Sequence, residues 1–120
     1  MNLLQSFRRL GQQMKGWSKA IDMQLHQFAL IKKLYAKNGL KIKMTCSACP
    51  EQYEVFKEGK QVAYYRLRHG TFRIDYPTCG EETIYEADPN GDGIFDDNER
   101  LNYLTKAMRI VLSKISETNI

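Results

Sequence analysis

The spacing of apolar residues changes at Asn38-Gly39, and this change limits the folds open to the chain. Before this dipeptide, apolar side chains recur in alternating steps of four and three residues, which is typical of a helix with one apolar stripe. Between residues 40 and 86 they alternate with a period of two, which is typical of half-buried β-strands. Asn and Gly end helices at little steric cost. The sequence therefore predicts an α+β protein.

The predicted N-terminal helix, residues 1–39, carries its apolar stripe at Leu3, Phe7, Leu10, Met14, Trp17, Ile21, Phe28, Ile31 and Tyr35, with Gln24 in the one missing place. A glycine costs a helix about 1 kcal/mol relative to alanine, so one long helix and a helix pair broken near Gly16 both stay open. The stripe can pack on the chain's own domain, on another chain or on a lipid surface. We predict that it binds a protein partner or a second copy, with the contacts made by Phe7, Leu10, Met14, Trp17, Ile21, Phe28 and Ile31.

Charge divides the chain at nearly the same place as periodicity does. Residues 1–43 hold nine basic and one acidic side chain, whereas the other 77 residues hold nine basic and thirteen acidic ones. A chain of 120 residues closes one modest core. We therefore expect a basic amphipathic helical arm, residues 1–39, followed by a small α+β domain, residues 40–120.

The predicted domain contains a small antiparallel sheet and a final helix packed on it. Alternation predicts strands at residues 40–45, 52–57, 61–68, 71–76 and 82–86, and it places turns at Glu58-Gly59 and His69-Gly70. The last helix is expected from about residue 97 to 115, because its apolar positions form a stripe wide enough to cover such a sheet.

One face of the predicted long hairpin is basic and carries an aromatic side chain. Its members are Tyr64, Arg66, Arg68 and Arg73. Guanidinium groups bind phosphates and a tyrosine can stack a base, so this face is a candidate nucleic-acid surface. The alternative is an ordinary solvated sheet face.

Residues 88–99, DPNGDGIFDDNE, form an acidic loop that resembles an EF-hand calcium loop. Oxygen side chains stand at loop positions 1, 3, 5, 9 and 12, with Gly93 at position 6. The resemblance implies calcium ligands at Asp88, Asn90, Asp92, Ile94 (through its carbonyl), Asp96 and Glu99. A strand, rather than a helix, is predicted before the loop. The alternative is an acidic turn that ends in a helix cap, with Asp96 and Glu99 forming a capping box.

Cys46 and Cys49 resemble one knuckle of a zinc ribbon, and Cys79 resembles half of the other. Three thiolates are one ligand short of a closed structural zinc site. His69 and Asp75 could supply the fourth ligand, but neither stands at knuckle spacing. We therefore expect reduced cysteines and do not favour zinc as a cofactor; calcium is the candidate cofactor.

No catalytic motif is recognisable in the sequence, so we predict a non-enzymatic protein. Arg8 and Arg9 stand where a signal peptide would be apolar, and no apolar run is long enough to span a membrane, which favours the cytoplasm. The leading function is an interaction or regulatory protein that binds through its N-terminal helix. The alternative is a nucleic-acid-binding protein that uses the basic arm and the Tyr64, Arg66, Arg68 and Arg73 face.

Overall fold

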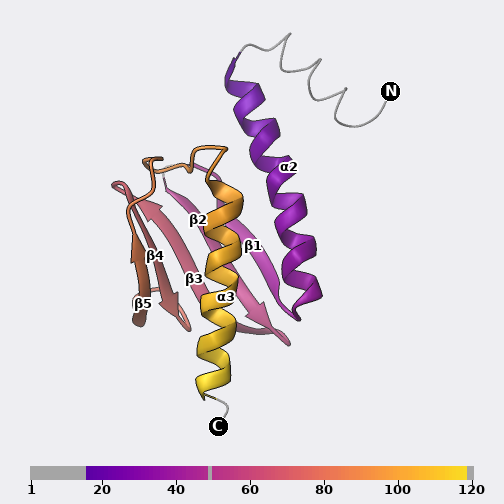
Figure 1. Cartoon of the computed structure of the whole chain (residues 1–120), viewed down its shortest axis with the longest axis vertical. Coiled ribbons are helices and arrows are strands. Elements are labelled where there is room, and N and C mark those ends of the chain that lie inside the picture. Colours follow the sequence, from indigo (N-terminus) through magenta and orange to yellow (C-terminus); the bar gives the residue numbers. More distant parts are fainter. Residues whose placement is uncertain (1–15, 49, 119–120) are drawn as a thin grey trace.

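The computed structural model describes residues 16–48 and 50–118, with side chains from residue 22 onward. Its elements, in chain order, are α2 (Gly16–Lys37), β1 (Lys41–Cys46), β2 (Glu51–Lys57), β3 (Lys60–Arg68), β4 (Thr71–Tyr76), β5 (Glu82–Ala87) and α3 (Arg100–Thr118). This arrangement of a helix, an antiparallel sheet and a second helix confirms the predicted α+β fold (Figure 1).

The five strands form one antiparallel sheet in which every strand lies beside its neighbour in the chain, in the order β1-β2-β3-β4-β5. Each strand begins and ends within one residue of its predicted bounds. The two predicted turns are confirmed: Glu58-Gly59 links Lys57 to Lys60, and His69-Gly70 links β3 to β4. All four turn residues have positive φ angles, between 51° and 81°. Positive φ at both central residues is what a tight type I′ hairpin turn requires.

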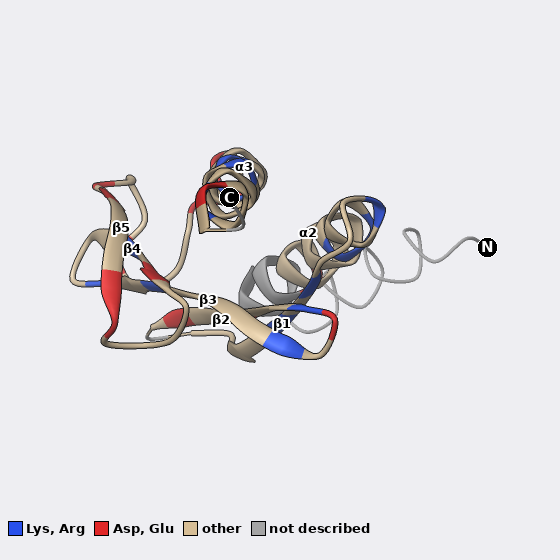
Figure 2. Ribbon diagram, turned by 90° about the horizontal axis from the view of Figure 1, so that it is seen from below, with Lys and Arg blue, Asp and Glu red and all other residues tan. Residues whose placement is uncertain are grey.

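Both helices lie on the same face of the sheet, while β4 and β5 turn up toward α3 (Figure 2). α2 ends as predicted, because Gly39 has a φ of 75° and the Leu40 N–H donates back to the Tyr35 carbonyl at 2.9 Å. α3 begins at Arg100 and ends at Thr118, three residues later at each end than predicted. None of the described helices is both long and apolar enough to cross a membrane.

The core lies between the helices and the inner face of the sheet. Tyr35 of α2 is fully buried there, and its hydroxyl donates to the Leu104 carbonyl of α3 at 2.6 Å and lies 2.8 Å from the Tyr65 hydroxyl of β3. Burial raises the pKa of both Tyr35 and Tyr65. The described part of α2 therefore packs against both the sheet and α3.

Candidate functional site

The acidic loop, residues 88–99, is organised around the carboxylate of Glu99. Oε1 of Glu99 accepts the N–H groups of Gly91 at 2.7 Å and of Asp96 at 3.0 Å, and Oε2 accepts the N–H of Asn90 at 2.9 Å. Burial alone would raise the pKa of Glu99, but the three N–H donors and the Arg100 charge outweigh burial and lower it. The bond to Asp96 is the returning half of the predicted capping box.

Two glycines allow the loop to fold this tightly. A Cβ atom at Gly91 would collide with the Ile94 carbonyl oxygen, and Gly93 has a φ of 79°. The Gly93 carbonyl in turn accepts the Glu51 N–H of β2 at 2.7 Å. The loop is therefore attached to the sheet through its own backbone.

The predicted calcium ligands do not converge in this arrangement. Both Glu99 oxygens are occupied by backbone N–H donors, and Asp88 accepts a hydrogen bond from the Thr71 hydroxyl at 3.2 Å. Across residues 16–48 and 50–118, no three His, Cys, Asp or Glu side chains gather in a way that could hold a metal ion. Ca²⁺ needs six to eight converging oxygens, so these residues do not fit calcium unless Glu99 rearranges. Calcium binding stays a prediction from the spacing of the loop.

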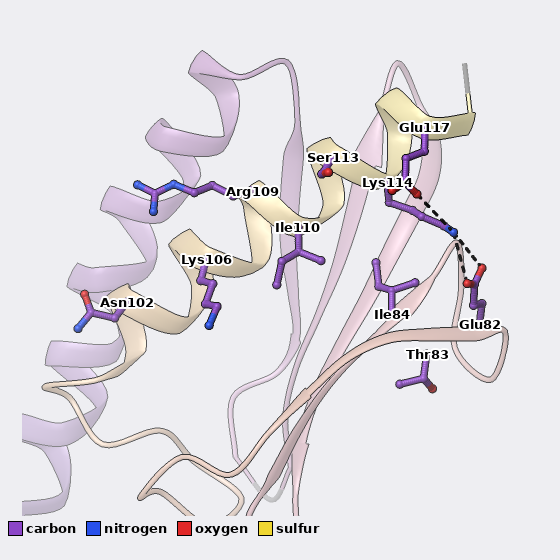
Figure 3. Close-up of a pocket in the computed structure, with 10 residues that line it drawn as sticks. All are labelled: Glu82, Thr83, Ile84, Asn102, Lys106, Arg109, Ile110, Ser113, Lys114 and Glu117. Carbon is purple, nitrogen blue, oxygen red and sulfur yellow. Dashed lines mark hydrogen bonds and ion pairs between the residues drawn. The ribbon is translucent and has the colours of Figure 1, made fainter. Parts of the chain in front are cut away.

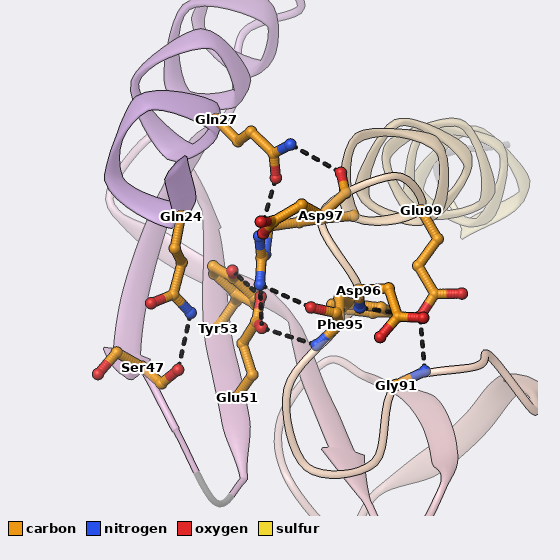
Figure 4. A network of polar contacts seen from close by, with 11 residues as sticks. Gln24, Gln27, Ser47, Glu51, Tyr53, Gly91, Phe95, Asp96, Asp97 and Glu99 are labelled. Atoms are coloured by element: carbon orange, nitrogen blue, oxygen red, sulfur yellow. Dashed lines mark hydrogen bonds and ion pairs between the residues drawn. The ribbon is translucent and has the colours of Figure 1, made fainter. Parts of the chain in front are cut away.

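A buried ion pair, Glu51 with Arg100, contacts the loop at Phe95. Figure 4 shows Glu51 and Phe95 pointing toward one another. Arg100 Nε donates to Glu51 Oε2 at 2.9 Å, and Nη2 donates to Glu51 Oε1 at 3.1 Å and to the Phe95 carbonyl at 2.9 Å. Glu51 also accepts the Tyr53 hydroxyl and the Phe95 N–H. Burial opposes the Arg100 charge, but Glu51 and Asp97 raise the pKa of Arg100 above its ordinary value. We call this cluster, Glu51, Tyr53 and Arg100, the buried hub.

The buried hub extends to α2 through Gln27. Arg100 Nη1 donates to Gln27 Oε1 at 2.8 Å, and Gln27 Nε2 donates to the Asp97 carbonyl at 2.7 Å. One turn earlier, Gln24 Nε2 donates to the Ser47 carbonyl at 2.7 Å. Two buried amides therefore fix α2 in place: Gln27 joins it to the acidic loop, and Gln24, the polar break in the apolar stripe, joins it to the link between β1 and β2.

The apolar stripe of α2 faces inward wherever its side chains are described. Ile31 is only 1% exposed, and Phe28 packs on Tyr53 with ring centroids 5.7 Å apart. Ile31 is thus not free to bind a partner, because it belongs to the core. The other predicted contacts, Phe7, Leu10, Met14, Trp17 and Ile21, lie outside the residues whose side chains are described.

A pocket of about 650 Å³ opens where α2 meets the acidic loop. It is lined by Gln24, Ser47, Ala48, Ile94, Phe95, Asp96, Asp97, Asn98 and Arg100. Ile94 is exposed here, and α2 also exposes Met23, Leu25 and Leu30. We call these four exposed side chains and the pocket the α2–loop junction.

The buried hub has one faint signal in the sequence, and no motif marks it. Arg100 stands in the first turn of α3, where a cation meets the positive end of the helix dipole unfavourably. A cation at that place implies a nearby anion. Its partner, Glu51, is 49 residues away in the chain, so no local pattern identifies it.

The outer face of the sheet carries the predicted arginine set. Arg66 of β3 lies directly across from Arg73 of β4, and both line one cavity with Arg68. Tyr64 does not fit its predicted role, because it is only 8% exposed and its hydroxyl donates to Gln52 Oε1 at 2.7 Å. A base therefore has no exposed Tyr64 ring on which to stack.

Two of the three cysteines lie in described segments. Cys46 is half-buried at the end of β1, with its Sγ 3.0 Å from the Ala48 carbonyl oxygen, and Cys79 is exposed. Burial, and then the Cys79 thiol beside it, raise the pKa of Tyr64. Cys49 lies outside the described residues, so the predicted three-cysteine set stays untested.

A wider groove of about 910 Å³ separates β5 from α3 (Figure 3). Two of its three cations have partners: Lys114 pairs with Glu82 at 3.3 Å, and Lys106 lies 5.1 Å from the ring centroid of Tyr85. Ile84 and Ile110 add apolar surface to its walls. The groove therefore offers less unpaired charge than the outer face does.

No family model, no curated protein and no solved structure matches the chain. The α2–loop junction and the outer face of the sheet are the two candidate functional surfaces of the described residues.

Proposed function

We propose that the protein is a non-enzymatic interaction protein that binds a protein partner, or a second copy of itself, through the α2–loop junction. One observation carries this proposal. Of the four exposed large hydrophobic side chains in the described segments, Met23 (41%), Leu25 (49%) and Leu30 (47%) lie on α2, and Ile94 (38%) lies on the adjoining loop. Single exposed apolar residues are ordinary, but here all four of these side chains lie on α2 or the adjoining loop, and none lies on the sheet or on α3.

The junction is also held in place before any partner arrives. Gln27 joins α2 to Arg100 and to the Asp97 carbonyl, and Gln24 joins it to the Ser47 carbonyl. A surface fixed in this way loses little conformational freedom on binding, which favours affinity. The buried hub and the Glu99 bonds therefore support the proposed role of the acidic loop as a stiff edge of the binding surface.

Site-specific photo-crosslinking tests the proposal. A photoreactive phenylalanine analogue would replace Leu25 or Leu30 in the native host, with Glu58 as the matched control position. Glu58 is exposed in the β2–β3 turn, at the end of β2 opposite Glu51 and the acidic loop. We expect adducts of defined mass from positions 25 and 30 and none from position 58. An adduct of twice the chain mass would identify a self-contact. Equal labelling from position 58, or no adduct at all, would overturn the proposal.

Nucleic-acid binding is the alternative function. It is supported by the three arginines that line one cavity on the outer face and by the basic excess of residues 1–43. The two functions separate by salt dependence. Phosphate contacts make affinity fall steeply as salt rises, whereas apolar burial at the α2–loop junction is nearly indifferent to salt.

A further inference from the structure

Three arginines and one carboxylate line the cavity on the outer face of the sheet. It has a volume of about 340 Å³ and is lined by Arg66, Arg68, His69, Thr71, Arg73 and Glu86. Arg66 and Arg73 are direct cross-strand partners, and like charges in that position repel. An anion placed between the two guanidinium groups would relieve this repulsion.

The arginines of this cavity lack the partners that the buried hub gives to Arg100. Within the described segments Arg66 has no ion pair. Arg73 has one partner, Asp75, with Arg73 Nε 3.0 Å from Asp75 Oδ1. The Asp75 oxygens also accept the Gly80 N–H and the Thr83 hydroxyl, each at 2.9 Å. Asp75 therefore offsets the Arg73 charge in part, and Arg66 is the arginine of this cavity that no carboxylate pairs.

We propose that this cavity binds the phosphate monoester group of a small phosphorylated molecule. Guanidinium groups match phosphate oxygens in paired hydrogen bonds, and two of them face each other across β3 and β4. The inference is independent of the proposed partner surface, because no residue of the α2–loop junction lines this cavity.

Acidic residues next to the cavity favour a single phosphate group over a nucleic-acid strand. Glu86 lies across from Arg73, and Glu54 and Asp75 lie on either side of Tyr64. A phosphodiester backbone needs a continuous row of cations, and these acids confine the unpaired charge to one place. The burial of Tyr64 also removes the stacking surface that a single strand would use.

Nuclear magnetic resonance titration of the isotope-labelled chain tests the site. Inorganic phosphate and then phenyl phosphate would be added at constant ionic strength, with chloride as the compensating anion. We expect saturable shifts in the Nε–H signals of Arg66 and Arg73. Arg66→Gln should weaken binding by roughly ten- to a hundredfold, the effect of losing one charge-assisted hydrogen bond. Arg109→Gln is the matched control, because Arg109 is exposed on α3 and does not line this cavity.

Arg68→Gln provides a second variant if Arg66→Gln perturbs the fold. A titration that does not saturate, or one that Arg66→Gln and Arg68→Gln leave unchanged, would overturn the inference. A single-stranded oligonucleotide that causes the same shifts and that phenyl phosphate fails to displace would also overturn it, in favour of nucleic acid. Displacement of the oligonucleotide by phenyl phosphate would support the phosphate monoester site.

Discussion

Two sets of arginines in this protein have opposite surroundings. Arg100 is buried and is held by Glu51, Gln27 and the Phe95 carbonyl. Arg66 and Arg73 face each other on the outer side of the sheet; Arg66 has no ion pair in the described segments, and the Arg73 side chain is 27% exposed and pairs with Asp75. A fully paired, desolvated guanidinium can only hold the fold together. An unpaired one at a cavity still has donors to offer a ligand. The comparison shows that an arginine's hydrogen-bond and ion-pair partners, and not its residue type, distinguish structural arginines from candidate binding arginines.

The largest expected effect comes from breaking the buried hub. Arg100→Gln leaves the Glu51 carboxylate buried without its countercharge, which typically destabilises a protein by about 3–5 kcal/mol. The measurement is urea unfolding at neutral pH. Replacing both partners with apolar side chains, Glu51→Leu with Arg100→Met, should recover much of the loss. If the double variant is less stable than Arg100→Gln alone, the unpaired Glu51 charge is not the main cause of the lost stability.

Ile31 and Leu30 of α2 allow the same comparison between a buried and an exposed position for apolar side chains. Ile31→Ala removes a fully buried side chain and should lower the free energy of unfolding by about 2–5 kcal/mol. Leu30→Ala, at its exposed neighbour, should change it by less than about 0.5 kcal/mol. Thermal or urea unfolding of both variants tests this. Equal losses would mean that Leu30 is part of the core and not part of the α2–loop junction.

Glu99 should have a smaller, pH-dependent effect. Its pKa is lowered in the folded chain, so its stabilisation is fully present above its unfolded pKa of about 4.3 and is lost as pH falls through the folded value. Glu99→Gln should therefore cost about 1–3 kcal/mol at pH 7, and the difference from the unchanged protein should shrink toward pH 3. The free energy of unfolding of both proteins, measured from pH 7 to pH 3, tests whether the difference shrinks. A difference that grows on acidification would contradict it.

Asp92→Ala is the control in the acidic loop, because Asp92 is exposed. The loop as folded predicts a nearly neutral change and no calcium-dependent melting shift. The calcium prediction from spacing expects a stabilisation of about 2.7 kcal/mol at a hundredfold excess over Kd, and it expects Asp92→Ala to remove that stabilisation.

Local chemistry explains why most of the fold was predictable. The period of two, the Asn38-Gly39 stop and the Glu58-Gly59 and His69-Gly70 turns act over a few residues, and each has its structural counterpart. The pairing of faces on the β3–β4 hairpin was also predictable, since Arg66 lies across from Arg73. Alternation along two strands joined by a tight turn determines such a register.

The site was less predictable, because its parts meet only in the folded chain. Glu51 and Arg100 are 49 residues apart, and the apolar stripe does not indicate which surface it packs on. Ile31 packs on the chain's own sheet. The acidic loop has calcium-like spacing, yet its Glu99 binds backbone N–H groups, and the sequence is equally compatible with both arrangements.

The smallest expected stability change belongs to Arg66→Gln, and it provides the most direct test of the comparison. The measurement is the free energy of unfolding in urea of the unchanged chain, Arg66→Gln and Arg100→Gln, each with and without inorganic phosphate at constant ionic strength. We predict that Arg66→Gln without phosphate lies within about 0.5 kcal/mol of the unchanged chain. Phosphate should stabilise the unchanged chain and not Arg66→Gln, because a ligand that binds only the folded state adds stability. Arg100→Gln should be much less stable, yet it should still gain stability from phosphate. Equal destabilisation by Arg66→Gln and Arg100→Gln, with no gain from phosphate in any chain, would contradict the division of the arginines into structural and binding sets.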